Sequence, residues 1–297
     1  MVICIGEILA DMQGHTCNEH MEFACFAGGA PFNVACCLKK LGIDTGFCGS
    51  VGYDTIGDFL IDIVKKQQFN YSYIQRDKER NTTLAFVEVD SMGERKFSFY
   101  RKNTADAYLP HELIEQIVCL ADIIHIGSLP LSSADGCAFV DELIAFAHNC
   151  NKKISFDVNY RSDIFSSEGE AIELYRKYIE EADIVKFSEE ELLMFIDGKS
   201  VEERLCRLAG KHKMVLLTLG SQGSVTFHTL VVNHVVVISD LFKYGNFDFF
   251  SVKRIYVRHY SIFFHISPHI TLLMPPPNER IPIVPNSEQK SSVLFHT

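Results

Sequence analysis

The sequence has no tryptophan, no Cys-x-x-C pair, and no apolar run of the roughly 18 residues that a membrane-spanning helix needs. We therefore expect no membrane segment. The ten cysteines are scattered, without the spacing of a metal site or a disulfide framework. This pattern predicts reduced, mostly buried thiols in a cytoplasmic protein. No basic leader precedes the first apolar stretch, so the sequence does not predict a signal peptide.

The charge balance is acidic, because 28 lysines and arginines face 38 aspartates and glutamates, for a formal charge of −10. Nucleic acids and anionic membrane surfaces are bound by basic faces, so we expect neither as a partner. With 297 residues, 47% of them hydrophobic, the chain can bury a sizeable core in one domain or two.

The last 72 residues differ in composition from the rest of the chain. Residues 226–297 contain no alanine, one glycine and four acidic residues, but six of the nine prolines. They show neither a helical period nor an alternation of strands and helices. We expect an atypical, partly disordered tail over 226–297, after a domain over 1–225 that is incomplete at its C-terminal end.

The first three quarters alternate between apolar strands and amphipathic helices. A buried strand is predicted at residues 2–8, and further strands are predicted at residues 22–26, 45–51, 122–127, 154–158, 183–187 and 214–219. A clear helix follows Asp54, which is placed to cap it, and further helices separate the later strands. This order predicts an α/β fold with a doubly wound, mostly parallel sheet and helices on both faces.

A glycine turn at residues 28–29 precedes a helix that is apolar nearly all round. Gly28 and Gly29 allow a tight turn and close approach to a ligand, and Pro31 suits the first turn of a helix. Asn33 is the only polar side chain in the first two turns. Two interpretations remain open: a local turn in which Asn33 bonds the backbone, or a ligand cradle at the positive helix end.

A hairpin interrupts the α/β pattern. Residues 82–90 and 95–101 are β-rich runs joined by residues 91–94, and Phe97 and Phe99 give one face an aromatic character. Such a hairpin is either a flap over a site or a plain edge hairpin. Asp11, which follows the first apolar run, is expected at the carboxyl end of a strand, where open α/β sheets bind ligands.

Four motifs stand in order on these residues: Gly28-Gly29-Ala30-Pro31-Phe32-Asn33, Asp157-Val158-Asn159-Tyr160-Arg161, Lys186-Phe187-Ser188-Glu189-Glu190-Glu191 and Thr218-Leu219-Gly220-Ser221-Gln222-Gly223. Together they resemble the ribokinase/PfkB family of carbohydrate kinases, and the residues of the motifs are most similar to those of its fructokinases. The resemblance implies a ribokinase-like fold with a small β lid from about residues 12–26 and 82–101. It also implies ATP-dependent phosphorylation of a sugar hydroxyl with Mg²⁺, and it allows a homodimer through the lid.

The resemblance assigns site residues in two groups. Sugar contacts would fall on Asp11, Gly28, Gly29 and Asn33, with Arg101 and Arg161 as additions. The nucleotide would use Asn159, Ser188, Thr218, Gly220 and Gly223, and Glu191 would organise Mg²⁺. Local readings stay open, since Ser188 and Glu191 also form a capping box and residues 220–223 also read as a simple turn.

One family motif is missing from the printed sequence. The family's closing Gly-Ala-Gly-Asp supplies an anion hole and the aspartate base, and Gly245-Asn246-Phe247-Asp248 matches only two of its four letters. Asp248 is therefore a weak candidate base, and the catalytic residue is left unassigned. The sequence predicts a sugar kinase, most simply for fructose, whose turnover is impaired. The alternatives are a catalytically dead sugar- or nucleotide-binding protein, and a kinase for an acidic sugar such as 2-keto-3-deoxygluconate.

Overall fold

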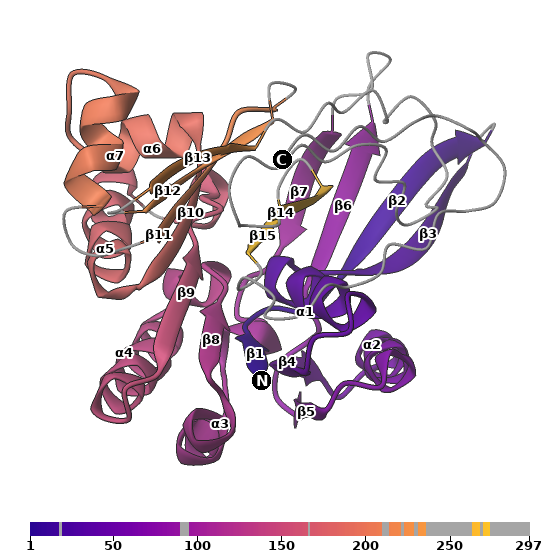
Figure 1. Cartoon of the computed structure of the whole chain (residues 1–297). Coiled ribbons are helices and arrows are strands. Elements are labelled where there is room, and N and C mark those ends of the chain that lie inside the picture. The colour runs from indigo at the N-terminus through magenta and orange to yellow at the C-terminus, as the bar shows by residue number, and fades with distance from the viewer. Residues whose placement is uncertain are drawn as a thin grey trace, which may run out of the picture.

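A computed structural model describes residues 1–17, 20–89, 95–165, 167–209, 214–220, 223–228, 231–235, 263–267 and 270–273 (Figure 1). Asp248, the hairpin turn at 91–94 and most of the segment 226–297 lie outside these residues. The expectations attached to them are therefore not addressed by the structure.

The described residues form a main sheet of nine strands. In spatial order these are β13 (Val231–Val235), β12 (Ser224–His228), β11 (Met214–Thr218), β10 (Ile184–Ser188), β9 (Lys153–Asp157), β8 (Ile123–Ile126), β1 (Val2–Ile5), β4 (Thr45–Gly52) and β5 (Tyr71–Asp77). The neighbours from β11 to β5 pair in parallel, whereas β12 and β13 are antiparallel additions at one edge.

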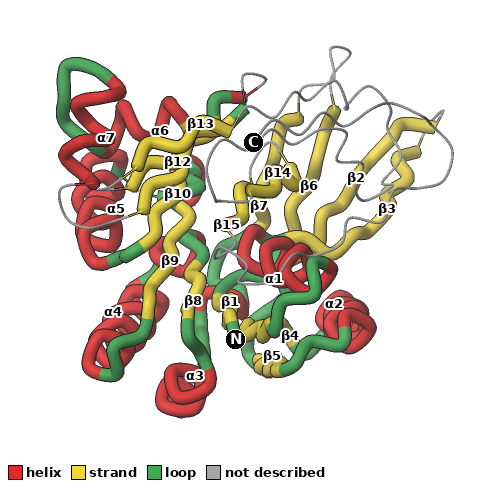
Figure 2. The backbone as a smooth tube through the Cα atoms, in the orientation of Figure 1, coloured by secondary structure: helices red, strands yellow, loops and turns green. Residues whose placement is uncertain are grey.

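Helices cover both faces of the main sheet (Figures 1 and 2). On one face α1 (Ala30–Lys40) and α2 (Thr55–Gln67) share a core with β1 and β4. The other face carries α3 (Ile114–Leu120), α4 (Ala134–Asn149), α5 (Glu168–Glu181), α6 (Glu189–Phe195) and α7 (Val201–Ala209) over the larger core. The predicted doubly wound α/β architecture is confirmed. No helix of the described part has the length and apolarity needed to cross a membrane.

Local sequence signals place several of these helices. Asp54 caps α2 as expected, since its carboxylate accepts the Gly57 N–H at 2.7 Å. Ser133 caps α4 in the same way, accepting the Gly136 N–H at 3.0 Å. Lys39 and Lys40 end α1 near its negative pole, with Gly42 (φ 78°) just beyond.

A second sheet stands beside the carboxyl edge of the main sheet, and we call it the lid sheet (Figure 1). Its order is β3 (His20–Gly28), β2 (Leu9–Cys17), β6 (Leu84–Val89) and β7 (Arg95–Tyr100). The expected hairpin is present as the antiparallel pair β6–β7. Its inner face buries Leu9 and Ala85 against Leu129, which anchors the lid sheet to the core.

The structure corrects three details and places the expected domain boundary within a strand. The run 2–8 is not one strand, because β1 ends at Ile5 and Gly6 (φ 141°) turns the chain toward β2. Asp11 therefore lies within β2 of the lid sheet rather than at the end of a main-sheet strand. Strand β5 was not anticipated. The expected boundary at residue 225 falls inside β12, and the main sheet continues to Val235.

The cysteines of the described part carry free thiols, and a short strand pair follows the main sheet. All nine cysteines reported for the described residues are free, but only Cys4, Cys36, Cys37 and Cys48 are fully buried. Cys119, Cys150 and Cys206 are exposed, so the expectation of mostly buried thiols is wrong for these surface helices. Two short strands, β14 (Phe263–Ser267) and β15 (Ile270–Leu273), form a separate antiparallel pair.

Candidate active site

Most of the predicted site residues lie at one edge of the main sheet. Parallel strands β9, β10 and β11 end at Asp157, Ser188 and Thr218, and β1 ends just before Gly6. Because parallel strands carry their carboxyl ends to the same edge, the glycine turn and the nucleotide motifs meet there. The lid sheet rises from this edge (Figure 1).

The glycine turn and Asp11 are in direct contact. A Cβ atom placed on Gly28 would lie 2.3 Å from the Asp11 Oδ2 atom. A Cβ on Gly29, whose φ is 114°, would lie 2.3 Å from the carbonyl oxygen of Glu7. Both glycines are therefore required by close approach, and together with Asp11 they form a cradle at the start of α1.

Asn33 lies on the first turn of α1, above this cradle. Gly29 is the N-cap of α1 and offers no side chain to the first N–H groups of the helix, and Pro31 has no N–H of its own. The Asn33 N–H makes the ordinary helical bond to the Gly29 carbonyl at 2.9 Å. Its side chain, which is partly buried, makes no hydrogen bond within the described residues, and this favours the ligand-cradle interpretation over the local one.

Glu7 supports the cradle from beneath. Its Oε1 atom accepts the N–H of Ala30, the first residue of α1, at 3.1 Å. Its Oε2 atom is buried without a partner in the described part of the chain. Burial raises the pKa of Glu7 from about 4.5 to about 7, although the Ala30 N–H and the nearby Arg101 oppose this. Glu7 is the only charged residue in the apolar run from Val2 to Ala10, and this isolation was the signal from which a functional or structural role could have been predicted.

The raised pKa makes the stability of the fold depend on pH. Between about pH 4.5 and 7 the folded state binds more protons at Glu7 than the unfolded chain. This contribution is complete below pH 4.5 and is lost as the pH rises through 7. We expect the free energy of unfolding of wild type to fall relative to Glu7→Gln by about 3 kcal/mol between pH 4.5 and 8.

Urea titrations followed by circular dichroism at several pH values measure this difference. Glu115→Gln, on the exposed face of α3, is the matched control and should track wild type at every pH. A constant gap between wild type and Glu7→Gln across this range would contradict the assignment.

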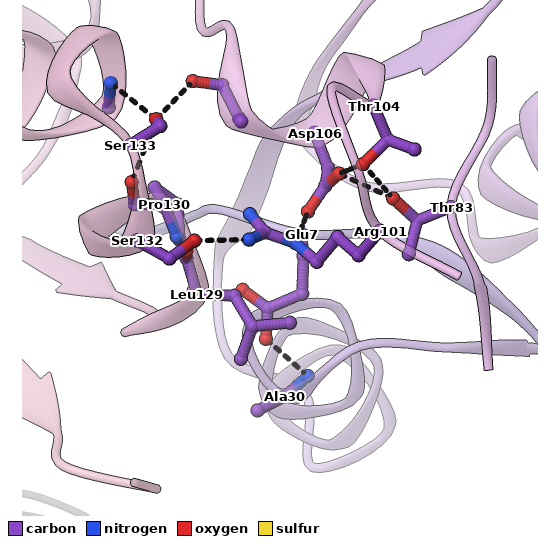
Figure 3. A network of polar contacts seen from close by, with 12 residues as sticks. Glu7, Ala30, Thr83, Arg101, Thr104, Asp106, Leu129, Pro130, Ser132 and Ser133 are labelled. Atoms are coloured by element: carbon purple, nitrogen blue, oxygen red, sulfur yellow. Dashed lines mark hydrogen bonds and ion pairs between the residues drawn. The ribbon is translucent and has the colours of Figure 1, made fainter. Parts of the chain in front are cut away.

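Arg101 lies at the base of the lid sheet, where its side chain is 5% exposed (Figure 3). Its Nε atom donates to Asp106 Oδ2 at 2.6 Å, and its Nη1 atom donates to the Ser132 hydroxyl. The Nη2 atom is buried and has no partner among the described residues. The guanidinium of Arg101 therefore forms a buried ion pair with Asp106. The contact between Arg101 and the sugar stays a prediction.

The nucleotide residues gather on three adjacent strand ends. Ser188 of β10 and Thr218 of β11 are register partners, and Thr218 Oγ1 donates to the Phe187 carbonyl at 3.2 Å. Asn159 follows β9 with a φ of 35°, a left-handed conformation that is uncommon outside glycine. Its carbonyl accepts the Ser128 hydroxyl at 3.3 Å, which ties it to the loop after β8.

Leu219, Gly220 and Gly223 flank the position at which both interpretations expected a turn. Gly220 and Gly223 have φ values of 55° and 99°, and the Gly223 N–H donates to the Gly220 carbonyl at 3.2 Å. The Leu219 N–H donates to the Gly223 carbonyl at 2.8 Å. Residues 221–222 lie outside the described part. A Cβ on Gly220 would meet no atom of the described residues within 4 Å.

Glu191 links two of these strand ends. Its Oε2 accepts the Ser188 N–H at 2.7 Å, while the Ser188 hydroxyl accepts the Glu191 N–H at 3.2 Å, which confirms the capping box. Its Oε1 accepts the Tyr160 N–H at 2.8 Å. The carboxylate therefore joins the β9 loop to the start of α6. Arg161, the next residue, donates to the Tyr160 carbonyl at 3.0 Å.

A buried ion pair underlies this region of the sheet. The Lys186 ammonium lies 3.0 Å from Asp157 Oδ1, and both side chains are almost fully buried. Burial raises the pKa of Asp157, and Lys186 opposes that shift. Burial and Lys186 together lower the pKa of the neighbouring His125 to about 4, so this imidazole is neutral at pH 7. The pair fixes the β9 and β10 ends below Asn159 and Ser188.

The chain is similar to known proteins over most of its length. A profile described as pfkB family carbohydrate kinase matches residues 1–240. The "Probable fructokinase-5" of Arabidopsis thaliana is 33% identical over 230 residues, which are 75% of this chain and 71% of that protein.

Two solved structures superpose on most of the chain. Fructokinase from Xylella fastidiosa with bound ATP does so with a TM-score of 0.69 and 31% identity, over 78% of this chain and 72% of that one. Fructokinase from Vibrio cholerae O395, in its fructose, ADP and calcium ion bound form, gives 0.67 and 27%, over 78% and 74% of the two chains.

The fold and the ordered motifs define a ribokinase-like sugar kinase. The chain belongs to the pfkB family of carbohydrate kinases, which are phosphotransferases. The family match extends to residue 240, beyond the boundary expected at 225 and a few residues past the end of β13.

Proposed function

We propose that the chain binds a neutral sugar, most simply fructose, at the Asp11–Gly28–Gly29–Asn33 cradle, and ATP along the ends of β9, β10 and β11. The observation that carries this proposal is the contact between Asp11 and the Gly28 backbone at the start of α1. An ionised carboxylate accepts hydrogen bonds from two neighbouring hydroxyls, which suits a sugar. The solved fructokinase from Xylella fastidiosa has bound ATP, and that from Vibrio cholerae O395 has bound fructose and ADP.

The nucleotide would lie beside the 219–223 turn, with its phosphates directed toward Asn159 and Ser188. Exposed N–H groups and glycines let phosphate oxygens approach a backbone closely. Two observations support this placement of the nucleotide. A Cβ on Gly220 would meet no atom of the described residues within 4 Å, and the backbone of Asn159 is in the left-handed conformation.

Magnesium would be organised by Glu191. Each Glu191 oxygen already accepts one N–H, which leaves further lone pairs on the carboxylate. The described residues hold no group of three His, Cys, Asp or Glu side chains that could form a complete cage. These donors fit a hydrated Mg²⁺ that takes its remaining ligands from water and phosphate. When bound, the ion neutralises charge on the transferring phosphoryl group.

The chain's own residues would act mainly by positioning. Asp11 and the α1 amide end would orient the sugar hydroxyl, and the lid sheet would exclude water from it. The printed sequence offers no Gly-Ala-Gly-Asp motif to deprotonate that hydroxyl, and Asp248 lies outside the described residues. We therefore propose slow turnover.

The acidic-sugar alternative rested on Arg101 and Arg161. The charge of Arg101 is already paired with Asp106, and Arg161 lies near Asp157 and donates to the Tyr160 carbonyl. The Nη2 atom of Arg101 is buried without a partner among the described residues, but Asp106 already balances the charge of this guanidinium, and this supports a neutral sugar.

A coupled assay of ADP release with Mg-ATP tests the function. We expect turnover that depends on fructose, is slower than that of an intact fructokinase, and exceeds the turnover with 2-keto-3-deoxygluconate. Sugar and ATP binding by calorimetry without any turnover would favour the binding-protein alternative. Absence of both binding and turnover would refute the proposal.

We also propose a cytoplasmic homodimer joined through the outer face of the lid sheet. Met21, Phe23 and Tyr100 are exposed on that face, and Phe23 and Tyr100 each meet the ring of Phe86 about 5 Å away. Covering this aromatic row with a second copy would remove it from water. The free thiols of the described cysteines suit a reducing compartment.

Light scattering during gel filtration measures the dimer. We expect wild type to elute as a dimer and Phe23→Asp combined with Tyr100→Asp to elute as a monomer. Leu193→Asp, on the exposed surface of α6, is the control and should remain dimeric. A monomeric wild type would contradict the proposal.

A further inference from the structure

Two strands of the lid sheet join the core at one buried polar cluster. Strand β6 begins just after Thr83, and β7 ends just before Arg101 (Figure 3). We call the cluster the lid-root network, and its members are Thr83, Arg101, Thr104, Asp106 and Ser132. All five lie between the lid sheet and the main sheet, and Thr83, Thr104 and Asp106 are almost inaccessible to solvent.

Asp106 is the centre of this network. Its Oδ2 atom pairs with Arg101 Nε at 2.6 Å, and its Oδ1 atom accepts from the hydroxyls of Thr104, at 2.8 Å, and Thr83. The ion pair is buried, with side-chain exposures of 5% for Arg101 and 1% for Asp106. A buried pair of this kind adds little net stability but imposes one geometry on the elements that it joins.

The network reaches the sugar cradle through the backbone. The Thr83 carbonyl accepts the N–H of Ala10 at 3.0 Å, and Ala10 directly precedes Asp11 on β2. Asp11 is the register partner of Ala85 on β6, so the position of β6 determines the position of Asp11 on the neighbouring strand. A shift of Thr83 would therefore move the Asp11 carboxylate relative to Gly28.

The other end of the network is fixed to the main body of the fold. Ser132, which accepts from Arg101, ends the short 3₁₀ helix Leu129–Ser132 and is followed by Ser133, the cap of α4. Asp106 lies in a second 3₁₀ segment, Ala105–Ala107, and the Ala105 N–H donates to the Asn81 carbonyl at 3.0 Å. The lid root is thus clamped from two sides.

We propose that Arg101 and Asp106 are positioning residues, which set the lid root so that Asp11 meets the sugar at Gly28–Gly29. Arg101 acts on the sugar through Asp106, Thr83 and β2, rather than by touching it. The proposed effect on catalysis rests on the sugar-kinase function above, whereas the clamp itself does not.

Hydrogen exchange of the ligand-free protein tests the clamp without any activity. In Asp106→Asn we expect the amides of β2, β6 and β7 to exchange about tenfold faster, because the amide presents a donor to Arg101 where the carboxylate accepted. Ser132→Ala, a milder variant, should accelerate the same amides by about threefold. Asp197→Asn, which breaks an exposed pair with Arg176, is the matched control and should leave them unchanged.

Steady-state kinetics test the consequence for the sugar. We expect the KM for sugar to rise about tenfold in Asp106→Asn and in Arg101→Gln, with the KM for ATP unchanged. The double variant should be no worse than either single variant, because both changes break one clamp. Arg101→Lys should recover part of the lost sugar affinity, since lysine keeps the positive charge but lacks the planar guanidinium with its several N–H donors.

Two results would overturn the proposal. One is normal lid exchange in a folded Asp106→Asn protein. The other is a loss of sugar affinity in Arg101→Gln that Asp106→Asn does not share, which would mean that Arg101 touches the sugar directly. If the wild type shows no kinase activity, the exchange experiment still decides the clamp, and only the proposed function fails.

Discussion

Asp11→Asn is expected to weaken sugar binding about 100-fold while leaving ATP affinity and the free energy of unfolding nearly unchanged. The Asp11 carboxylate lies against the backbone of Gly28, beside the start of helix α1. Its replacement removes one acceptor oxygen and the charge from the proposed sugar contact. Hydrogen bonds to charged groups contribute roughly 1.5 to 3 kcal/mol each, and about 2.8 kcal/mol corresponds to a 100-fold change.

Isothermal titration with fructose and with ATP separates the two affinities. Asp62→Asn is the matched control, because Asp62 is exposed on α2 and pairs only with Lys65 nearby. Equal fructose affinity in wild type and Asp11→Asn would show that the sugar binds elsewhere. A parallel loss of ATP affinity would indicate a collapsed fold rather than a lost contact.

Gly29→Ala is expected to lower the free energy of unfolding by about 3 to 5 kcal/mol, and to abolish sugar binding in whatever protein remains folded. Its Cβ would lie 2.3 Å from the Glu7 carbonyl oxygen, which is backbone and cannot rotate away. The φ of 114° adds strain for any residue with a side chain. The turn would have to open, and α1 would then lose its alignment with Glu7 and Asp11.

Gly42→Ala is the control for backbone strain alone. Gly42 also has a positive φ, 78°, but a Cβ there would meet nothing within 4 Å. We expect a cost of about 1 kcal/mol at this position. Urea unfolding followed by circular dichroism suits the comparison, since the chain has no tryptophan for fluorescence. Similar costs at the two glycines would contradict the close approach at Gly29.

The sequence pattern predicted most of the α/β core because its signals are local. The cap at Asp54, the period of α2 and the apolar strands β4, β8, β9, β10 and β11 each follow from neighbouring residues. The capping box of Ser188 with Glu191 was likewise visible in four residues. The resemblance to a kinase family rested on the order of four motifs, and the match to the pfkB family confirms that family.

The lid sheet and its root were harder to predict, since they depend on contacts between distant residues. Strand β2 contains glycine and polar residues and pairs in parallel with β6, more than 70 positions later. The hydrogen-bond partners of Asp106 come from residues 83, 101 and 104, and the local sequence Ala-Asp-Ala does not predict them. The sequence predicted no role for Glu7, because its contact with Ala30 spans 23 residues.

Hydrogen exchange with fructose and ATP added separately tests the central claim, that the sugar lies under the lid sheet and the nucleotide at the β9–β11 ends. We predict that fructose slows the amides of β2 and of the first turn of α1, and leaves residues 214–220 unchanged. ATP should slow residues 157–161, 188–191 and 214–220 instead. Protection of β9–β11 by fructose, or of the cradle by ATP alone, would contradict the account.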